Sequence, residues 1–239
     1  ADLDARSNII KFLVPLCFGL LYYVRAYLTT AILNVSRIIL LALPLMLFFL
    51  AVSGTFNVFK MSEYIKGDVT FEGVDFDGTQ KEQSLIADTR TFIYIENIYS
   101  AEKHDYWLVG HSPARGYESF YFGADDMTGR GERLGSEVSI LNVFTWTGLI
   151  GVFLYFFIFY RASYLAINES NNIFSQLVGL FVAFRWAYAW VEDFNNFNMF
   201  YFSLWLMIGM CFSLSFRAMS NKEVISWVKG IFNIKVNIK

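Results

Sequence analysis

The sequence predicts an all-α polytopic membrane protein with about five transmembrane helices and one large exoplasmic loop that contains short amphipathic helices. Three observations predict this fold: an apolar composition, five apolar blocks along the chain, and a long polar stretch between the second and third blocks. Of the 239 residues, 56% are hydrophobic and only 17% are charged, and the mean hydropathy is +0.42. A soluble domain of this length cannot bury so much apolar surface, so the composition favours a bilayer as the solvent.

The apolar blocks divide the chain into regions. The blocks are residues 9–24, 38–54, 138–160, 173–190 and 199–216. The third is long enough to cross about 30 Å of hydrocarbon at 1.5 Å per residue, whereas the first carries Lys11 and the fourth carries Arg185. The predicted regions are two transmembrane helices in 1–56, a loop or lid in 57–136, three transmembrane helices in 137–216 and a basic cytoplasmic tail in 217–239.

Basic residues orient the predicted helices. Arg25 and Arg37 flank the connection between the first two blocks, Arg161 follows the third block, and the tail is basic. The positive-inside rule places these residues in the cytoplasm, which leaves the polar loop on the opposite face. The last residues, 225–239, alternate apolar and basic side chains. This pattern fits either a segment lying along an anionic inner leaflet or a solvated end.

Charge, cysteines and histidines exclude several classes of function. A net charge of −2 gives no indication of a nucleic-acid partner. Cys17 and Cys211 both lie in apolar blocks, which disfavours a disulfide framework, and two histidines without a His/Cys cluster disfavour a zinc centre. We therefore expect no metal and no cofactor. The chain opens with Ala1 and has no recognisable signal peptide, so we expect it to be the C-terminal portion of a longer protein.

The polar loop contains one segment with helical periodicity. Apolar positions from Ser84 to Tyr99 fit an amphipathic helix, and Asp88 or Thr89 is a candidate cap for its second half. Turns or irregular connections are predicted at 71–80, 110–116 and 125–135.

Four arginines in or beside the loop suit an anionic ligand. Arg90 lies in the predicted amphipathic helix, Arg115 in the 110–116 connection, and Arg130 and Arg133 just before the third block. A guanidinium fork matches phosphate oxygens two at a time. The alternative for each arginine is an ordinary surface ion pair with a neighbouring Asp or Glu residue.

Glu137 stands at the mouth of the third block, four residues after Arg133. If both residues are helical, this spacing places them on one helix face. A carboxylate at the membrane edge can accept a proton from an incoming hydroxyl. The alternative, a salt bridge to Arg133 and nothing more, is favoured when Glu137 is considered alone.

Arg185 is the strongest signal from a single residue, because a charge within a span is costly and usually faces protein or a water-filled cavity. Glu192 follows seven residues later, which returns it to nearly the same face of a continuous helix. The pair either lines a cavity or stabilises the bundle as an ion pair. His111, in the 110–116 connection, is a candidate substrate contact, although lone loop histidines such as His111 and His104 are more often solvated.

The segment from Glu137 to Gly151, EVSILNVFTWTGLIG, resembles the signature of the O-antigen ligase and O-antigen polymerase superfamily of bacterial membrane proteins. In that family a polar residue, often a His followed by Asn, precedes a Gly-Leu/Ile-Ile-Gly run by eleven residues. Arg90 followed after twenty residues by Gly110 resembles the family's periplasmic arginine helix and glycine turn, and Ser36-Arg37 resembles a further feature. Glu137 and Val138 stand where the family often has His and Asn. This difference argues against a His-dependent ligase and favours a polymerase-like member or a different base.

The resemblance implies a metal-independent glycosyltransferase in the bacterial inner membrane, with the large loop in the periplasm. A glycan linked to polyprenyl diphosphate would be polymerised there or, alternatively, transferred to lipid A-core as by a ligase. Arg90, Arg115 and Arg133 are then the expected diphosphate contacts, Arg90 and Glu137 the catalytic pair, and Arg185, Glu192 and His111 further substrate contacts. The expected partners are the polyprenyl-diphosphate-linked glycan, an acceptor glycan or lipid A-core, membrane lipid and a chain-length regulator protein.

Two other classes compete with the enzyme. A transporter would place Arg185 and Glu192 on a substrate pathway, but it often has internal repeats, and none is evident here. A non-catalytic polysaccharide export or assembly protein would tolerate the loss of individual loop charges. The sequence favours the enzyme because it combines the arginines with the order of the motifs.

Overall fold

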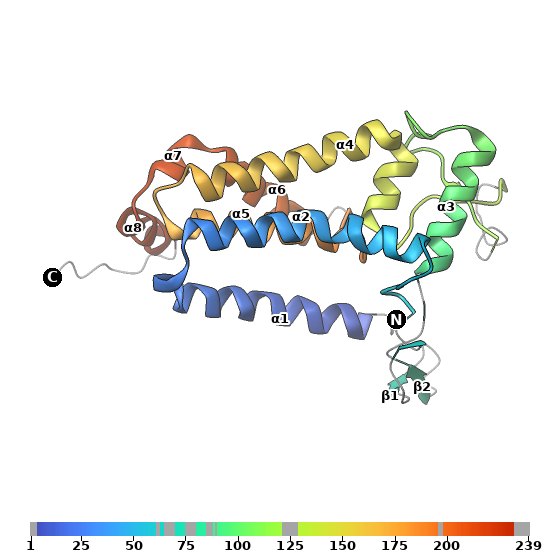
Figure 1. Ribbon diagram of the computed structural model, residues 1–239, viewed down its shortest axis with the longest axis horizontal. Coiled ribbons are helices and arrows are strands. Elements are labelled where there is room, and N and C mark those ends of the chain that lie inside the picture. The colour runs from blue at the N-terminus through green and yellow to red at the C-terminus, as the bar shows by residue number, and fades with distance from the viewer. Residues whose placement is uncertain are drawn as a thin grey trace. The chain divides into compact units, whose positions relative to one another are not determined.

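The computed structural model describes residues 4–60, 63–64, 70–74, 80–84, 88, 90–120, 129–195 and 198–231 of the chain, and these residues are mostly helical (Figure 1). The helices are α1 (Asp4–Tyr23), a 3-10 turn η1 (Arg25–Tyr27), α2 (Thr30–Val52), α3 (Thr91–His104), α4 (Ser139–Asn168), α5 (Ile173–Tyr188), α6 (Met199–Phe212), α7 (Leu214–Ala218) and α8 (Asn221–Ile231). Each of the five predicted apolar blocks is helical. The predominantly helical prediction is therefore confirmed.

Two helices among the described residues are long and apolar enough to cross a membrane, α2 with 23 residues and α4 with 30. The other apolar helices of the second half are shorter. At 1.5 Å per residue, α5 is about 24 Å long and α6 about 21 Å, below the thickness of a hydrocarbon core. The expected number of five spans stays a prediction.

Two small antiparallel pairs of strands lie in the polar loop, and the sequence predicted none of these strands. β1 (Thr70–Val74) pairs with β2 (Gln80–Ser84), and β3 (Tyr117–Glu118) pairs with β4 (Glu132–Arg133). In the second pair, Tyr117 stands opposite Arg133. The predicted turns at 71–80 and 125–135 both lie partly outside the described residues.

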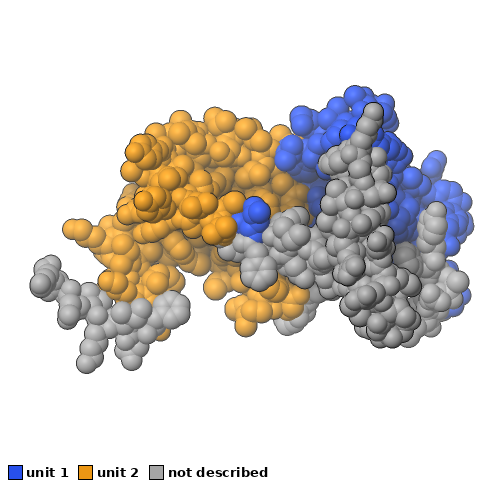
Figure 2. Space-filling view, turned by 90° about the horizontal axis from the view of Figure 1, so that it is seen from below, with its two compact units in different colours: residues 1–15, 43–154, 189–195 blue, residues 16–42, 155–188, 196–239 orange. Residues whose placement is uncertain are grey.

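The chain forms two compact units (Figure 2). Unit 1 comprises residues 1–15, 43–154 and 189–195, and unit 2 comprises residues 16–42, 155–188 and 196–239. The polar loop and the first half of α4 belong to unit 1, together with the turn that follows α5. The four regions predicted from the sequence were divided by their expected position in a membrane, whereas the two units are divided by compactness. The four regions therefore stay a prediction.

The core of unit 1 is made by α3, the start of α4 and the loop that joins α3 to β3. Ala101, Tyr106 and Phe144 form a buried cluster, against which Trp107 and Val152 pack. The face of α3 that points into this core includes polar residues, among them Glu96 and Asn97, which are 2% and 0% exposed. Unit 1 therefore buries a polar network beside its apolar contacts.

Unit 2 has a more conventional apolar core. Leu33 of α2, Ile167 of α4 and Leu180 of α5 are buried together, and flanking apolar side chains pack on them. Trp186 lies among the rings of Tyr155, Phe156 and Phe159 and donates its indole N–H to the carbonyl of Leu41 at 3.1 Å. This bond ties α5 to α2 within the unit.

Helix α4 is broken at Gly148, which has φ 64° and ψ −166°, and Figure 1 shows the change of direction. This backbone conformation is open almost only to glycine. The break removes the helical partners of peptide groups on both sides, and an unpaired buried peptide group is costly. The loop that follows α3 supplies the missing partners.

Four backbone hydrogen bonds join this loop to the break. The N–H groups of His111 and Ser112 donate to the carbonyls of Thr145 and Trp146, before the break, at 2.6 and 3.2 Å. After the break, the N–H groups of Leu149 and Ile150 donate to the carbonyls of Trp107 and Leu108 at 2.8 and 3.2 Å. The loop thus completes both halves of α4.

Close backbone approach at this junction requires glycine on both sides. A Cβ on Gly110, which has φ +76°, would lie 2.3 Å from the backbone nitrogen of Thr147. A Cβ on Gly148 would lie 2.3 Å from the carbonyl group of Leu108. We refer to Gly110, Gly148 and the four hydrogen bonds as the glycine junction.

Replacing Gly148 by Ala is expected to destabilise the protein by about 3 kcal/mol or more, because a Cβ meets backbone atoms and the φ/ψ values are unfavourable for alanine. Thermal unfolding of the protein in detergent measures this loss. Gly209→Ala is the matched control, since Gly209 lies inside α6 and a Cβ added there has no neighbour within 4 Å. Equal unfolding temperatures for the two variants would contradict the role given to the glycine junction.

Candidate functional site

The N-terminus of α3 is fixed by Asp88. Its carboxylate accepts hydrogen bonds from the N–H groups of Arg90 and Thr91 at 3.1 and 2.9 Å. Burial raises the pKa of Asp88, but hydrogen bonds from the Thr91 side chain and from the N–H groups of Thr91 and Arg90 outweigh it, so the pKa is lowered. Asp88, one of the two residues considered as a cap, accepts these hydrogen bonds from just outside the helix, whereas the N-cap position itself is Arg90. The predicted start of the helix at Ser84 is wrong, because Ser84 lies in β2 and α3 begins at Thr91.

Arg90 is held by the turn that follows α5. Its Nε donates to the carbonyl of Val191 at 3.3 Å, and its Nη2 lies 3.8 Å from a carboxylate oxygen of Glu192. One helical turn later, the hydroxyl of Tyr94 donates to the carbonyl of Trp190 at 2.7 Å, and burial raises the pKa of this phenol. The Arg90 side chain is only 11% exposed, so its charge lies close to the interior of unit 1.

Arg133 and Glu137 form an ion pair at the entrance to α4. The Arg133 guanidinium donates to both carboxylate oxygens of Glu137, and its Nη1 also donates to the Tyr117 hydroxyl at 3.3 Å. Burial raises the pKa of Tyr117 to about 12, so this phenol stays protonated at neutral pH. The pair was predicted from helical spacing, but Arg133 lies in β4 and α4 begins only at Ser139. The residues meet because the loop folds back before the helix starts.

The turn after α5 also caps α4. The N–H groups of Ser139 and Ile140 donate to the carbonyls of Glu192 and Ala189, and the Ser139 hydroxyl donates to Asp193 at 3.1 Å. Asn195 donates its side-chain amide to the Ser139 carbonyl. The segment 189–195 therefore connects the first residues of α3 and of α4, and it brings the surroundings of Arg90 to the helix that follows Glu137.

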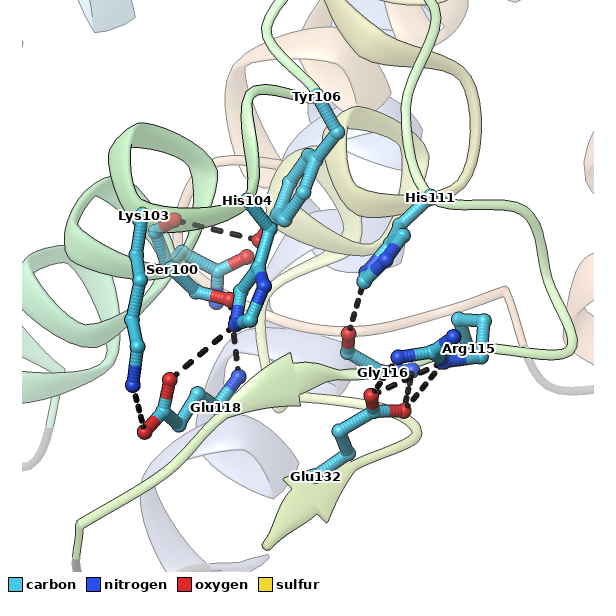
Figure 3. A network of polar contacts seen from close by, with 10 residues as sticks. Ser100, Lys103, His104, Tyr106, His111, Arg115, Gly116, Glu118 and Glu132 are labelled. Atoms are coloured by element: carbon cyan, nitrogen blue, oxygen red, sulfur yellow. Dashed lines mark hydrogen bonds and ion pairs between the residues drawn. The ribbon is translucent and has the colours of Figure 1, made fainter. Parts of the chain in front are cut away.

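A second polar network lies between the end of α3 and the β3–β4 pair (Figure 3). The Arg115 guanidinium donates to both carboxylate oxygens of Glu132, and the Gly116 N–H donates to the same carboxylate at 3.3 Å. Glu132 is 7% exposed. At the other side of the network, Glu118 accepts from Lys103 at 2.8 Å and lies 3.2 Å from His104.

The rings of His104, Tyr106 and His111 lie next to one another in this network (Figure 3). His111 stacks on Tyr106 with ring centroids 4.8 Å apart, and on His104 at 5.6 Å. Nδ1 of His111 lies 3.3 Å from the Gly116 carbonyl. Since a carbonyl only accepts, this contact favours the tautomer with the proton on Nδ1, which leaves the lone pair on Nε2.

The structure brings together most of the predicted site residues in unit 1. Arg90, Arg115, Arg133, Glu137, Glu192 and His111 all belong to that unit. Their segments are joined by hydrogen bonds to the first three turns of α4, through the glycine junction, the 189–195 segment and the short connection after β4. Each of the three arginines also contacts a carboxylate. The ion-pair alternative is met by Arg115 with Glu132 and by Arg133 with Glu137, whereas Arg90 is mostly buried and lies beside Glu192.

Arg185 is not part of unit 1. It belongs to unit 2, where its guanidinium carbon lies 5.7 Å from the centroid of the Tyr188 ring. The predicted continuous helix from Arg185 to Glu192 is wrong, because α5 ends at Tyr188 and a turn follows. The helical spacing that paired the two residues therefore does not apply.

Two buried polar residues of α3 were not predicted from the sequence. Glu96 accepts hydrogen bonds from the Ser119 hydroxyl and the Phe120 N–H at 2.9 and 2.7 Å. Asn97 accepts from the Thr145 hydroxyl at 2.6 Å. The available signal was positional: both follow the buried Ile93 by one turn on the face that carries the apolar residues.

Comparisons with known proteins add no relative. No family model, curated protein or solved structure matches this chain.

Glu132 is expected to make stability depend on pH. The hydrogen bond from Arg115 is the largest cause that lowers the Glu132 pKa below its ordinary value of 4.5. The contribution of ionised Glu132 to the free energy of unfolding is therefore fully present above pH 4.5. This contribution is lost as the pH falls through the lower pKa that Glu132 has in the folded state.

Thermal unfolding of the wild type and of Glu132→Gln, measured from neutral pH to well below 4.5, tests this expectation. The variant should lose about 1–2 kcal/mol at neutral pH, and the difference should shrink in acid. Glu102→Gln, a change at an exposed position of α3, serves as the control. A difference that stays constant across this range would show that ionisation of Glu132 contributes nothing.

Proposed function

We propose that this protein is a membrane glycosyltransferase that polymerises oligosaccharide repeat units linked to polyprenyl diphosphate on the periplasmic face of the bacterial inner membrane. One observation carries the proposal. Three arginines, Arg90, Arg115 and Arg133, belong to the same unit, and each lies in or contacts a segment that bonds to or leads into the first turns of α4, an apolar helix long enough to cross a bilayer. Such a group of cations beside a membrane helix suits a diphosphate at the end of a lipid.

The exposure of the long helices supports a membrane location. In the most apolar 18-residue windows, only 17% of the α2 residues and 28% of the α4 residues are buried inside the protein. The core helix of a soluble protein buries most of such a window, whereas lipid covers the remainder in a membrane protein. Basic residues such as Arg25 and Arg161 favour a cytoplasmic location for the opposite helix ends.

The ion pairs give the proposed site a chemical logic. In the transfer, an acceptor hydroxyl attacks the anomeric carbon, the bond from that carbon to the diphosphate oxygen breaks, and the hydroxyl proton passes to a base. Charge builds up on the departing diphosphate, where arginine donors stabilise it. Arginines that already hold carboxylates are charged and oriented, and a diphosphate can exchange with those carboxylates on binding.

Glu137 is the candidate base, and its carboxylate is partly accessible, with 35% of the side chain exposed. Its carboxylate is held by the Arg133 guanidinium while the pair is intact. Binding of diphosphate to Arg133 would release Glu137 towards the acceptor hydroxyl. The base is therefore formed by substrate binding in this scheme.

Arg133→Ala and Arg90→Ala are each expected to reduce polymer formation by at least about 100-fold, because each removes a donor to the leaving group. The assay incubates the purified protein in lipid nanodiscs with polyprenyl-diphosphate-linked repeat units and resolves the products on a gel. Lys60→Ala is the control, because Lys60 is an exposed cation of the same loop.

Three outcomes discriminate the functions. Polymer made by the wild type, and lost in the arginine variants, supports the proposal. Product formed only when lipid A-core is supplied would identify a ligase instead. No product under either condition, from protein that is folded and inserted, would favour a non-catalytic assembly role.

Glu137→Gln is expected to lower the turnover rate by about 100-fold or more and to remove the acidic limb of the pH–rate profile, since an amide cannot accept the proton. If Glu137 only positions Arg133, the same variant should retain the acidic limb while binding donor more weakly. The measurement is kcat and KM for the donor glycan as a function of pH. An unchanged profile would remove Glu137 from the role of base.

A further inference from the structure

Arg37 of α2 is a buried cation in unit 2, remote in sequence from the arginines of the proposed active site. The residue is only 4% exposed. Its guanidinium carbon lies 5.1 Å from the centroid of the Tyr160 ring and 5.4 Å from that of Tyr164, both on α4. The rings of α4 thus enclose a charge supplied by α2.

The Arg37 guanidinium is not satisfied by the described part of the protein. Nε and Nη1 are fully buried and have no hydrogen-bond partner, and no described carboxylate lies within the 4.0 Å of an ion pair. Contacts with tyrosine rings offset only part of the cost of removing a guanidinium from water. Buried donors without partners in an otherwise well-packed region indicate that a ligand or ion completes the site.

The surroundings of Arg37 favour an anion. The guanidinium of Arg161 lies 5.7 Å from the centroid of the same Tyr164 ring, so two cations flank one aromatic side chain. Arg161 is exposed, and Tyr160 is 39% exposed, so the rim of the site reaches the surface of unit 2. Two positive charges around one ring favour a bound negative group.

The site is also held rigidly. One turn before Arg37, the side chains of Asn34 and Asn168 exchange two hydrogen bonds, at 2.6 and 3.1 Å. One turn after it, the Leu41 carbonyl accepts from the Trp186 indole. These bonds fix α2 against α4 and α5, so the guanidinium is preorganised and little conformational entropy is lost on binding.

We propose that Arg37, with Arg161 at its rim, binds a phosphate group carried by an anionic lipid headgroup or free in solution. A phosphate supplies several oxygens that accept hydrogen bonds from a guanidinium group. Its negative charge also balances the positive charge of Arg37 and Arg161. Movement of the partly exposed Tyr160 or Arg161 side chain admits the ligand. This site does not depend on glycosyl transfer, because its residues belong to unit 2 and none of them acts in the proposed reaction.

The test is the thermal unfolding of the purified full chain in a neutral detergent with three separate additions: short-chain phosphatidylglycerol, the corresponding diacylglycerol without phosphate, and inorganic phosphate. Phosphatidylglycerol at roughly 100 times its Kd should raise the Tm of the wild type by about 5 °C, and diacylglycerol should not. Arg37→Met should lose this shift. Arg25→Met, which removes the same charge from an exposed arginine bonded to the Tyr22 carbonyl, should retain it.

Arg37→Met also gives a result that does not depend on added ligand. Without anions, removal of an unpaired buried charge should leave the Tm unchanged or raise it, because methionine occupies the site without a desolvation cost. A shift with inorganic phosphate alone identifies a free anion as the ligand, and a shift that requires phosphatidylglycerol identifies a lipid. The proposal is overturned if neither phosphate source shifts the wild type, or if Arg37→Met responds as the wild type does.

Discussion

The break in α4 at Gly148 is the constraint on which unit 1 depends. A helix that is otherwise apolar contains, at this point, peptide groups that its own backbone cannot pair, and the loop after α3 pairs them. The same loop carries His111 and leads directly to Arg115. The backbone chemistry of one helix therefore determines where the polar residues of the loop lie, and no side chain between Gly110 and Gly148 separates the two segments.

Charge is distributed differently in the two units. In unit 1, three arginines each contact a carboxylate, so these positive charges are matched by negative ones before any ligand binds. In unit 2, Arg37 is enclosed by tyrosine rings without a described carboxylate partner. The ion pairs of unit 1 suit a ligand that binds reversibly by replacing a carboxylate. The Arg37 site of unit 2 suits a ligand that stays bound as part of the folded structure.

The sequence predicted the helices well and the site incompletely. Apolar blocks specify helices because runs of apolar residues are a local property of the sequence. Asp88 was one of two residues considered as a cap, and its carboxylate does bond to the first N–H groups of α3. The Arg133–Glu137 pair was predicted, but from a helix that starts only after both residues. The burial of Asn97 against Thr145, and the docking of His111 on the break, depend on contacts between segments far apart in sequence, which periodicity does not encode.

The glycine junction has a consequence for how such a protein assembles. The loop that completes α4 is synthesised before α4, so it is already available when the helix forms. Until the two meet, peptide groups on both sides of the break have no backbone partner from the loop. Completion of α4 therefore depends on docking of this loop, and transplanting the loop between proteins requires transplanting the broken helix with it.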